Sequence, residues 1–267
     1  MTDNYKDIFD RVENSLKRLT DLTEKEFEQV YSRFYNQSFR QRTDDEYFDI
    51  LKMIVFYSGF KAVTVEKKEP IINKHFPDYK TVSRIDKSGI EKIMSDKDMI
   101  KNQGKISATV NNARTFEEIV KENGTFQNYI DKFSPNDSFE NLMLLKEELE
   151  YKFDYLGGIT VYHFLTDIGL NAIKPDRVLA RIFKRLGLIE NEKQLLKTVI
   201  QGRKFSEATK KPIRYVDIIF VKYGQQGTSD MFKIKGGICL ETNPKCELCG
   251  VTDFCNFYKT TEKRASR

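Results

Sequence analysis

Apolar side chains recur along most of this chain at the three- and four-residue spacing of an amphipathic helix. The clearest run follows Thr43 and places Tyr47, Ile50, Leu51, Ile54 and Val55 on one face. Thr23 and Thr43 are each followed three residues later by a glutamate, which is the signature of a capping box. We therefore predict that both threonines open helices.

Similar spacing predicts helices over residues 88–94, 106–120, 126–133, 141–152, 160–168, 176–186, 192–200 and 215–223. Strand-like alternation is scarce, and the breaks between segments are short and rich in Gly, Pro, Asn or Asp. No low-complexity linker and no repeat of solenoid period interrupts them. The pattern indicates an all-α protein with two closely packed lobes.

Composition narrows the class of protein. A chain of 267 residues can bury a core, and no stretch approaches the roughly 18 apolar residues of a membrane span, so we expect a soluble cytoplasmic monomer. The net charge of +5 suits a polyanionic partner. Only His75 and His163 are present, which argues against a histidine-rich metal site or a Ser-His-Asp triad.

All four cysteines lie within residues 239–255, separated by six, two and five residues. In a reducing compartment such a group is expected to bind metal rather than to form disulfides. Structural zinc sites pair two short knuckles, and here only Cys246 and Cys249 form one. Four thiolates on one short loop suit a [4Fe-4S] cubane, so the spacing favours iron–sulfur over zinc while leaving both open.

This loop, with Asn243-Pro244-Lys245 before the second cysteine, resembles the [4Fe-4S] loop of the endonuclease III family of DNA glycosylases. The resemblance implies that Cys239, Cys246, Cys249 and Cys255 hold a structural [4Fe-4S] cluster. It also implies a basic loop that faces DNA, with Lys245 directed to a phosphate.

Residues 153–163, FDYLGGITVYH, resemble the helix-hairpin-helix of that family. Gly157 and Gly158 would allow tight turns, and Thr160 would open the next helix at a position where the family usually has glycine. The resemblance implies that backbone N–H groups of this hairpin bind a DNA phosphate.

Residues 173–185, IKPDRVLARIFKR, carry a further match. Asp176 resembles the essential aspartate that caps a helix in the family, although an aspartate after proline is also a common N-cap. Such a carboxylate would stabilise positive charge on the deoxyribose and orient the attacking water. Tyr162 stands where lyase members carry a nucleophilic lysine, so the resemblance implies base removal by water without efficient strand cleavage.

A second resemblance covers residues 45–170, which are similar to bacterial 3-methyladenine DNA glycosylase I. The run from Lys105-Ile106 to Asn111-Asn112-Ala113-Arg114 carries it. The chain departs from that family at Ile54, where a pocket glutamate is usual, and near Ala62, where a tryptophan is usual. Phe60 lies where related families place a residue that fills the gap left by a flipped base.

These observations predict a two-lobed helix-hairpin-helix DNA glycosylase. One domain would span residues 40–160, and residues 1–39 plus 161–267 would form the iron–sulfur domain. Its substrate would be double-stranded DNA containing a modified base, of which an alkylated purine such as 3-methyladenine is favoured. The alternatives are a mismatch or oxidised-base glycosylase of the same superfamily, and a non-catalytic iron–sulfur DNA-binding protein.

Overall fold

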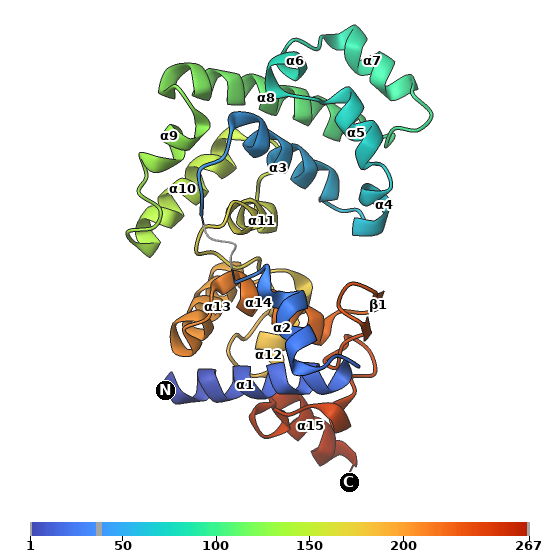
Figure 1. Ribbon diagram of the computed structural model, residues 1–267, viewed down its shortest axis with the longest axis vertical. Helices are drawn as coiled ribbons and strands as arrows, with labels where there is room; N and C mark the ends of the chain where they lie inside the picture. The colour runs from blue at the N-terminus through green and yellow to red at the C-terminus, as the bar shows by residue number, and fades with distance from the viewer. Residues whose placement is uncertain (1, 36–38, 266–267) are drawn as a thin grey trace. The chain divides into compact units, whose positions relative to one another are not determined.

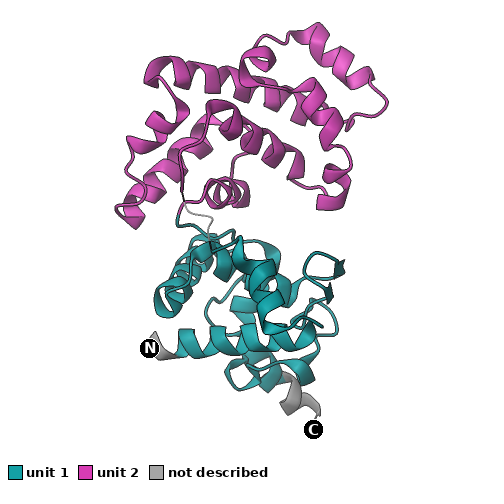
Figure 2. Cartoon of the chain, in the orientation of Figure 1, with its two compact units in different colours: residues 1–38, 171–267 teal, residues 39–170 magenta. Residues whose placement is uncertain are grey.

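The computed structural model describes residues 2–35 and 39–265. Helices make up most of the described chain, and its only strands form one short hairpin (Figure 1). The predicted all-α class is confirmed. Two compact units divide the chain, residues 1–38 with 171–267 as unit 1 and residues 39–170 as unit 2 (Figure 2). Among the described residues, no helix is long and apolar enough to cross a membrane.

Unit 2 is helical throughout. Its helices are α3 (Asp44–Tyr57), α4 (Ala62–Glu66), α5 (Glu69–His75), α6 (Tyr79–Ser83), α7 (Lys87–Ser95), α8 (Gln103–Asn123), α9 (Phe126–Asp131), α10 (Phe139–Lys152) and α11 (Ile159–Asp167). The long helix α8 packs against α3, α6, α7 and α9. Phe116 of α8 stacks on Phe126 with ring centroids 4.3 Å apart, and both rings are fully buried. This helix is therefore the centre of the unit.

Unit 1 combines the N-terminal segment with the C-terminal third of the chain. It contains α1 (Thr2–Leu19), α2 (Glu24–Ser32), α12 (Arg177–Arg185), α13 (Leu195–Thr209), α14 (Ile213–Gly224), β1 (Thr228–Ser229), β2 (Ile234–Lys235), the 3-10 turns η1 (Cys246–Leu248) and η2 (Thr252–Phe254), and α15 (Asn256–Ala265). Helix α1 packs on α13 and α14, and α12 packs on α14. Phe9, Phe183, Phe205 and Phe220 fill the space between these helices.

Both predicted capping boxes are confirmed. The hydroxyl of Thr23 accepts from the backbone N–H of Glu26, and that of Thr43 accepts from the N–H of Glu46. In each box the glutamate carboxylate accepts in turn from the backbone N–H of the threonine. The predicted domains, 40–160 and 1–39 plus 161–267, stay predictions, because dense packing within a unit does not show which segments fold independently.

Candidate active site and cysteine loop

Asp176 is the N-cap of α12. Its Oδ1 accepts hydrogen bonds from the backbone N–H groups of Val178 and Leu179, both at 2.9 Å, and the side chain is half-buried. The carboxylate is thus fixed at the positive end of a helix dipole. Pro175 precedes it and prevents the helix from starting earlier.

A second carboxylate, Asp217 of α14, shares the electrostatic environment of Asp176. Asp217 is 2% exposed, its Oδ2 pairs with Arg214, and its buried Oδ1 has no hydrogen-bond partner. The pKa of Asp217 is raised to about 6, chiefly by burial and in part by the Asp176 carboxylate, while Arg214 and Lys174 oppose the rise. The half-buried Asp176 therefore lies close enough to the buried Asp217 to act on its charge.

The opposite end of α12 is bonded to the cysteine loop, by which we mean residues 239–255. Arg181 is 7% exposed and donates to the carbonyl oxygens of Gly224 (2.7 Å) and Cys239 (3.2 Å). Arg185 donates to the carbonyl oxygens of Leu240 (2.7 Å) and Glu241 (3.1 Å). The two arginines thus join α12 to the cysteine loop through charge-assisted hydrogen bonds to backbone oxygens.

All four cysteines line one small cavity with a volume of about 20 Å³, which is room for about one water molecule. As placed, no group of three or more His, Cys, Asp or Glu side chains in the described part of the chain could hold a metal ion. The [4Fe-4S] cluster therefore stays a prediction that rests on the shared cavity and its sulfur donors.

Hydrogen-bond donors surround the sulfur atoms. Arg185 Nη1 lies 3.2 Å from Cys239 Sγ, Tyr223 Oη lies 2.9 Å from Cys249 Sγ, and the backbone N–H of Tyr258 lies 3.4 Å from Cys255 Sγ. Burial raises the pKa of Cys239, and Arg185 opposes the rise. N–H and O–H groups aimed at sulfur stabilise thiolates that bind iron, so this donor set fits a [4Fe-4S] cluster.

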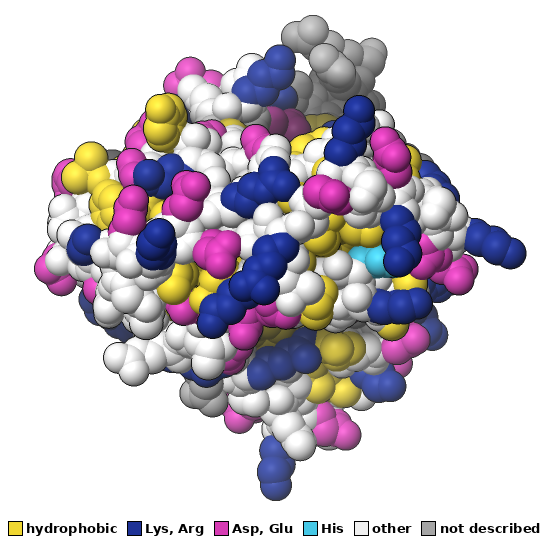
Figure 3. Space-filling model, turned by 90° about the horizontal axis from the view of Figure 1, so that it is seen from above, with side chains coloured by type: hydrophobic (Ala, Val, Ile, Leu, Met, Phe, Trp, Pro, Cys, Tyr) yellow, Lys and Arg dark blue, Asp and Glu magenta, His cyan; other side chains and the backbone are white. Residues whose placement is uncertain are grey.

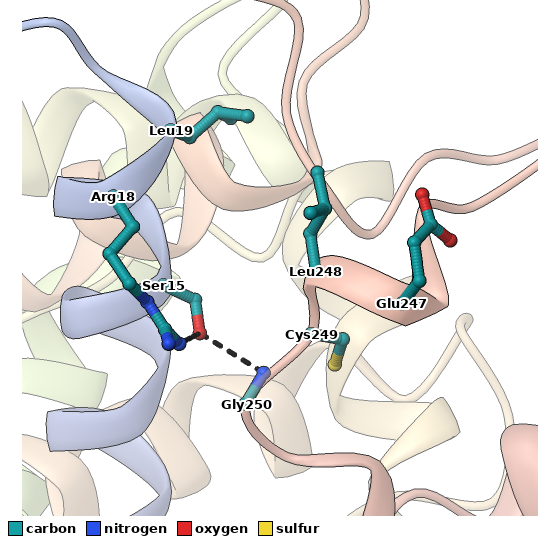
Figure 4. A pocket seen from close by; sticks show the side chains of 7 residues that line it. All are labelled: Ser15, Arg18, Leu19, Glu247, Leu248, Cys249 and Gly250. Atoms are coloured by element: carbon teal, nitrogen blue, oxygen red, sulfur yellow. Dashed lines mark hydrogen bonds between the residues drawn. The ribbon is translucent and has the colours of Figure 1, made fainter.

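A hollow separates the cysteine loop from α1. Ser15, Arg18 and Leu19 line it from the helix, and Glu247, Leu248, Cys249 and Gly250 line it from the loop (Figure 4). Ser15 Oγ accepts from the N–H of Gly250 at 3.0 Å and so ties the loop to α1.

Lys245, the predicted phosphate contact, is half-buried and its backbone N–H donates to the carbonyl of Ile238.

In unit 2, the predicted hairpin turns between α10 and α11. Gly158 has φ of +58° and is the N-cap of α11, and Leu156 is fully buried beneath the turn. The Gly158 N–H donates to Glu150 Oε1 at 2.6 Å. An acidic side chain therefore accepts the hydrogen bond that, by the resemblance, a DNA phosphate would accept. Thr160 Oγ1 bonds back to the carbonyl of Gly157 at 2.7 Å.

Tyr162 belongs to the interior of unit 2. It is 4% exposed, and its Oη lies 3.9 Å from Met143 Sδ. Burial raises the pKa of Tyr162, so the phenol is neutral at physiological pH. The nearby Lys146 pairs with Glu147 and Glu150.

Phe60 follows α3 in a turn and is 38% exposed, which makes it an exposed aromatic of unit 2 rather than a core residue. Its ring centroid lies 5.4 Å from Nζ of Lys105. Lys105 is 3% exposed, donates to the carbonyl of Val55, and has its pKa lowered to about 8 by burial.

On the face drawn in Figure 3, basic and acidic side chains are interspersed.

The structure thus gathers the four cysteines into one cavity and puts Asp176 on the helix that binds their loop. Phe60, the hairpin glycines, Thr160 and Tyr162 belong to unit 2. The sequence analysis missed Asp217 and the sulfur-binding role of Arg185. A charged residue inside the apolar run of residues 213–224 was a usable signal for Asp217, whereas nothing local indicates which sulfur an arginine meets.

The chain matches a known family over more than half of its length. The family model for methyladenine glycosylases covers residues 23–174. The match includes Phe60, the hairpin and Tyr162. It ends before Asp176 and the cysteine loop.

The chain is similar to solved structures of two DNA glycosylases. The 8-oxoguanine DNA glycosylase of Thermotoga maritima is 18% identical, covers 79% of this chain and 95% of its own, and has a TM-score of 0.52. The 3-methyladenine DNA glycosylase I of Staphylococcus aureus is 21% identical, covers 52% of this chain and 85% of its own, and has a TM-score of 0.43. The first of these shows that the described chain has the fold of an all-α glycosylase.

Replacing Asp217 by Asn tests the raised pKa. A carboxyl with a pKa of about 6 when folded and 3.8 when unfolded binds more protons in the folded state between these values. The free energy of unfolding of the natural chain therefore falls as the pH rises through this range, and the asparagine removes that fall. We subtract the free energy of unfolding of the natural chain from that of Asp217→Asn, each measured in urea. This difference should rise by up to about 3 kcal/mol between about pH 4 and about pH 7.

The exposed Asp230→Asn is the matched control in unit 1 and should show no such gain. A constant difference between Asp217→Asn and the natural chain across this pH range would contradict the raised pKa.

Proposed function

Because this chain belongs to the methyladenine glycosylase family, we propose that it flips a modified base out of double-stranded DNA and hydrolyses its glycosidic bond as a step of base excision repair. Membership makes the chain a DNA N-glycosylase. An alkylated purine such as 3-methyladenine is the proposed base. The single observation that carries this proposal is the family match over residues 23–174.

Asp176 is the proposed catalytic residue, and its own geometry supports the role because it lies beyond the matched residues. Two backbone N–H groups hold the carboxylate in place, and the side chain is only half-buried. As the base leaves, positive charge develops on the deoxyribose, and a fixed carboxylate stabilises that charge and orients the attacking water. A charge pair about 4 Å apart at an effective dielectric constant near 20 contributes roughly 4 kcal/mol.

DNA binding is assigned to groups on both units. Phe60 would enter the duplex and fill the gap left by the flipped base, which is supported by its exposure in a turn. The hairpin at Gly157, Gly158 and Thr160 would bind a phosphate through backbone N–H groups, with the phosphate replacing Glu150 at Gly158. Lys245 of the cysteine loop would contact another phosphate.

Two departures from the family, at Ile54 and near Ala62, argue against strict recognition of 3-methyladenine. Ile54, where the family has a pocket glutamate, is 1% exposed and lies in the core of unit 2. A methylated purine is already cationic, so its release needs less catalytic assistance than release of a neutral base. A chain that retains a fixed Asp176 could therefore act on more stable alkylated lesions as well.

The cysteine loop is the proposed site of a structural [4Fe-4S] cluster held by Cys239, Cys246, Cys249 and Cys255. The shared cavity and the donors at three sulfur atoms support this assignment. When bound, the cluster would supply rigidity to the loop that Arg181 and Arg185 join to α12. The proposed chemistry of base removal does not pass through it.

Asp176→Asn tests the catalytic carboxylate. Asparagine is also a good N-cap, so the fold should persist while the negative charge is lost. We expect base release under single-turnover conditions to fall roughly 100- to 1,000-fold, with the dissociation constant for lesion duplex nearly unchanged. A non-catalytic DNA-binding protein would show no base release from the natural chain.

Asp86→Asn is the matched control, because Asp86 caps α7 through the N–H of Gly89 in the same way. Its release rate should equal that of the natural chain. An Asp176→Asn rate within threefold of the natural rate would remove Asp176 from the mechanism.

The buried phenol at Tyr162 predicts little or no lyase activity, because a phenol cannot form the Schiff base that lysine forms with an abasic sugar. Incubation with abasic duplex and borohydride should give no covalent protein–DNA adduct on a denaturing gel. If an adduct forms and disappears in Lys152→Ala or Lys174→Ala, the monofunctional assignment is wrong.

Metal analysis of protein purified without oxygen tests the cluster. About four irons and four acid-labile sulfides per chain are expected, because a cubane contains four of each. Cys246→Ala should lose most of this content. One zinc per chain without sulfide, or no metal at all in folded protein, would overturn the cluster.

A further inference from the structure

A buried ammonium group lies against two exposed aromatic rings in unit 2. Nζ of Lys105 is 5.4 Å from the ring centroid of Phe60 and 4.7 Å from that of Tyr155. Lys105 itself is 3% exposed, whereas Phe60 is 38% exposed and Tyr155 is 40% exposed. The charged group therefore lies in the interior while both rings reach solvent, and each ring gains a cation–π contact that favours its position.

Tyr155 is held in a backbone conformation that a tyrosine seldom adopts. Its φ is +62°, and among the described residues it is the one aromatic with a positive φ. Such a conformation is strained for a bulky side chain and persists only where its surroundings impose it. The strain is placed in the hairpin segment, one residue before the buried Leu156.

Helix α8 imposes this conformation. Asn112 is 2% exposed and forms two hydrogen bonds with the backbone of Asp154, donating to its carbonyl at 2.9 Å and accepting from its N–H at 2.8 Å. On the other side, Thr160 Oγ1 donates to the carbonyl of Tyr155 at 2.6 Å. The chain on both sides of Tyr155 is thus fixed by side chains, and Lys105 of the same helix fixes the ring.

We propose that Phe60, Tyr155 and Lys105 form an aromatic clamp whose two rings stack on the DNA bases that lose a neighbour when the modified nucleotide is flipped out. The clamp rests on the proposed function, because only a flipped or missing base leaves such faces open. Unstacked bases fit two exposed rings by π-stacking. The ammonium beneath the rings and the exposed Lys61 beside Phe60 match the negative charge of the adjoining phosphates.

The clamp makes a prediction that general DNA binding does not. Contacts to phosphates act equally on intact and abasic duplexes, whereas stacking acts only where a base has lost its neighbour. Removing one ring should therefore lower the preference for abasic duplex and leave the affinity for intact duplex unchanged. The strained backbone of Tyr155 is then what places the second ring where it can stack on a DNA base.

The experiment measures dissociation constants of the full chain for two duplexes of one sequence, one intact and one with a tetrahydrofuran abasic analogue. Tyr155→Ala should lose about tenfold in preference for the abasic duplex, and Tyr155→Phe should keep it. Tyr155→Gly should lose the same preference without loss of thermal stability, because glycine adopts positive φ without strain. This variant keeps the test valid if Tyr155→Ala folds poorly.

Tyr151→Ala is the matched control, since Tyr151 lies on α10 in the same unit and is 88% exposed. It should bind both duplexes like the natural chain. If the two rings act as one clamp, the loss in Phe60→Ala combined with Tyr155→Ala should be smaller than the product of the single losses.

A preference within twofold of natural in Tyr155→Gly would overturn the clamp, and so would an equal loss on both duplexes. Base release is measured separately on lesion duplex. Release by the natural chain together with an unchanged preference in Tyr155→Gly would sink the clamp alone. No release from any lesion, with the preference still lost in Tyr155→Gly, would sink the proposed function alone.

Discussion

Helix α12 is the element on which the account of unit 1 depends, because both of its ends are engaged by specific polar contacts. Asp176 binds the free N–H groups at its start, and Arg181 and Arg185 bind carbonyl oxygens of the cysteine loop near its end. A helix held in this way keeps a charged carboxylate in one place without the cost of reorienting it during reaction. The cysteine loop thereby becomes part of the support of the candidate catalytic residue.

Unit 2 depends on α8 in a comparable way. Its buried Lys105 and Asn112 donate to backbone carbonyls of α3 and of the hairpin segment. The exposed Arg114 donates to the carbonyls of Ser83 and Ile85 on the side of α6. One helix thus binds three segments of the unit through polar side chains. These contacts give a structural role to Lys105, Asn112 and Arg114, which belong to the run that carries the resemblance to 3-methyladenine DNA glycosylase I.

The sequence predicted most of the helices, since capping boxes and apolar periodicity are local properties. It gave no bounds for α1 or α15 at the two ends of the described chain. It also did not predict α4, α5 and α6, which are too short for their periodicity to be visible, or the two-residue strands of the β-hairpin. Asp176 could be identified because a proline and an N-cap mark it locally. Asp217 was missed although its charge inside an apolar helical run was a usable signal. Tyr155 and the sulfur contacts of Arg185 could not be identified, because their environments are created by residues far away in the chain.

The most direct test of the central claim is release of free base by the natural chain from duplexes that each carry one modified base, followed by chromatography of the released base. The account predicts release of a methylated purine such as 3-methyladenine, leaving abasic DNA that alkali then cleaves. Release of an oxidised base or a mismatched base alone, or no release from any duplex by folded protein, would contradict it.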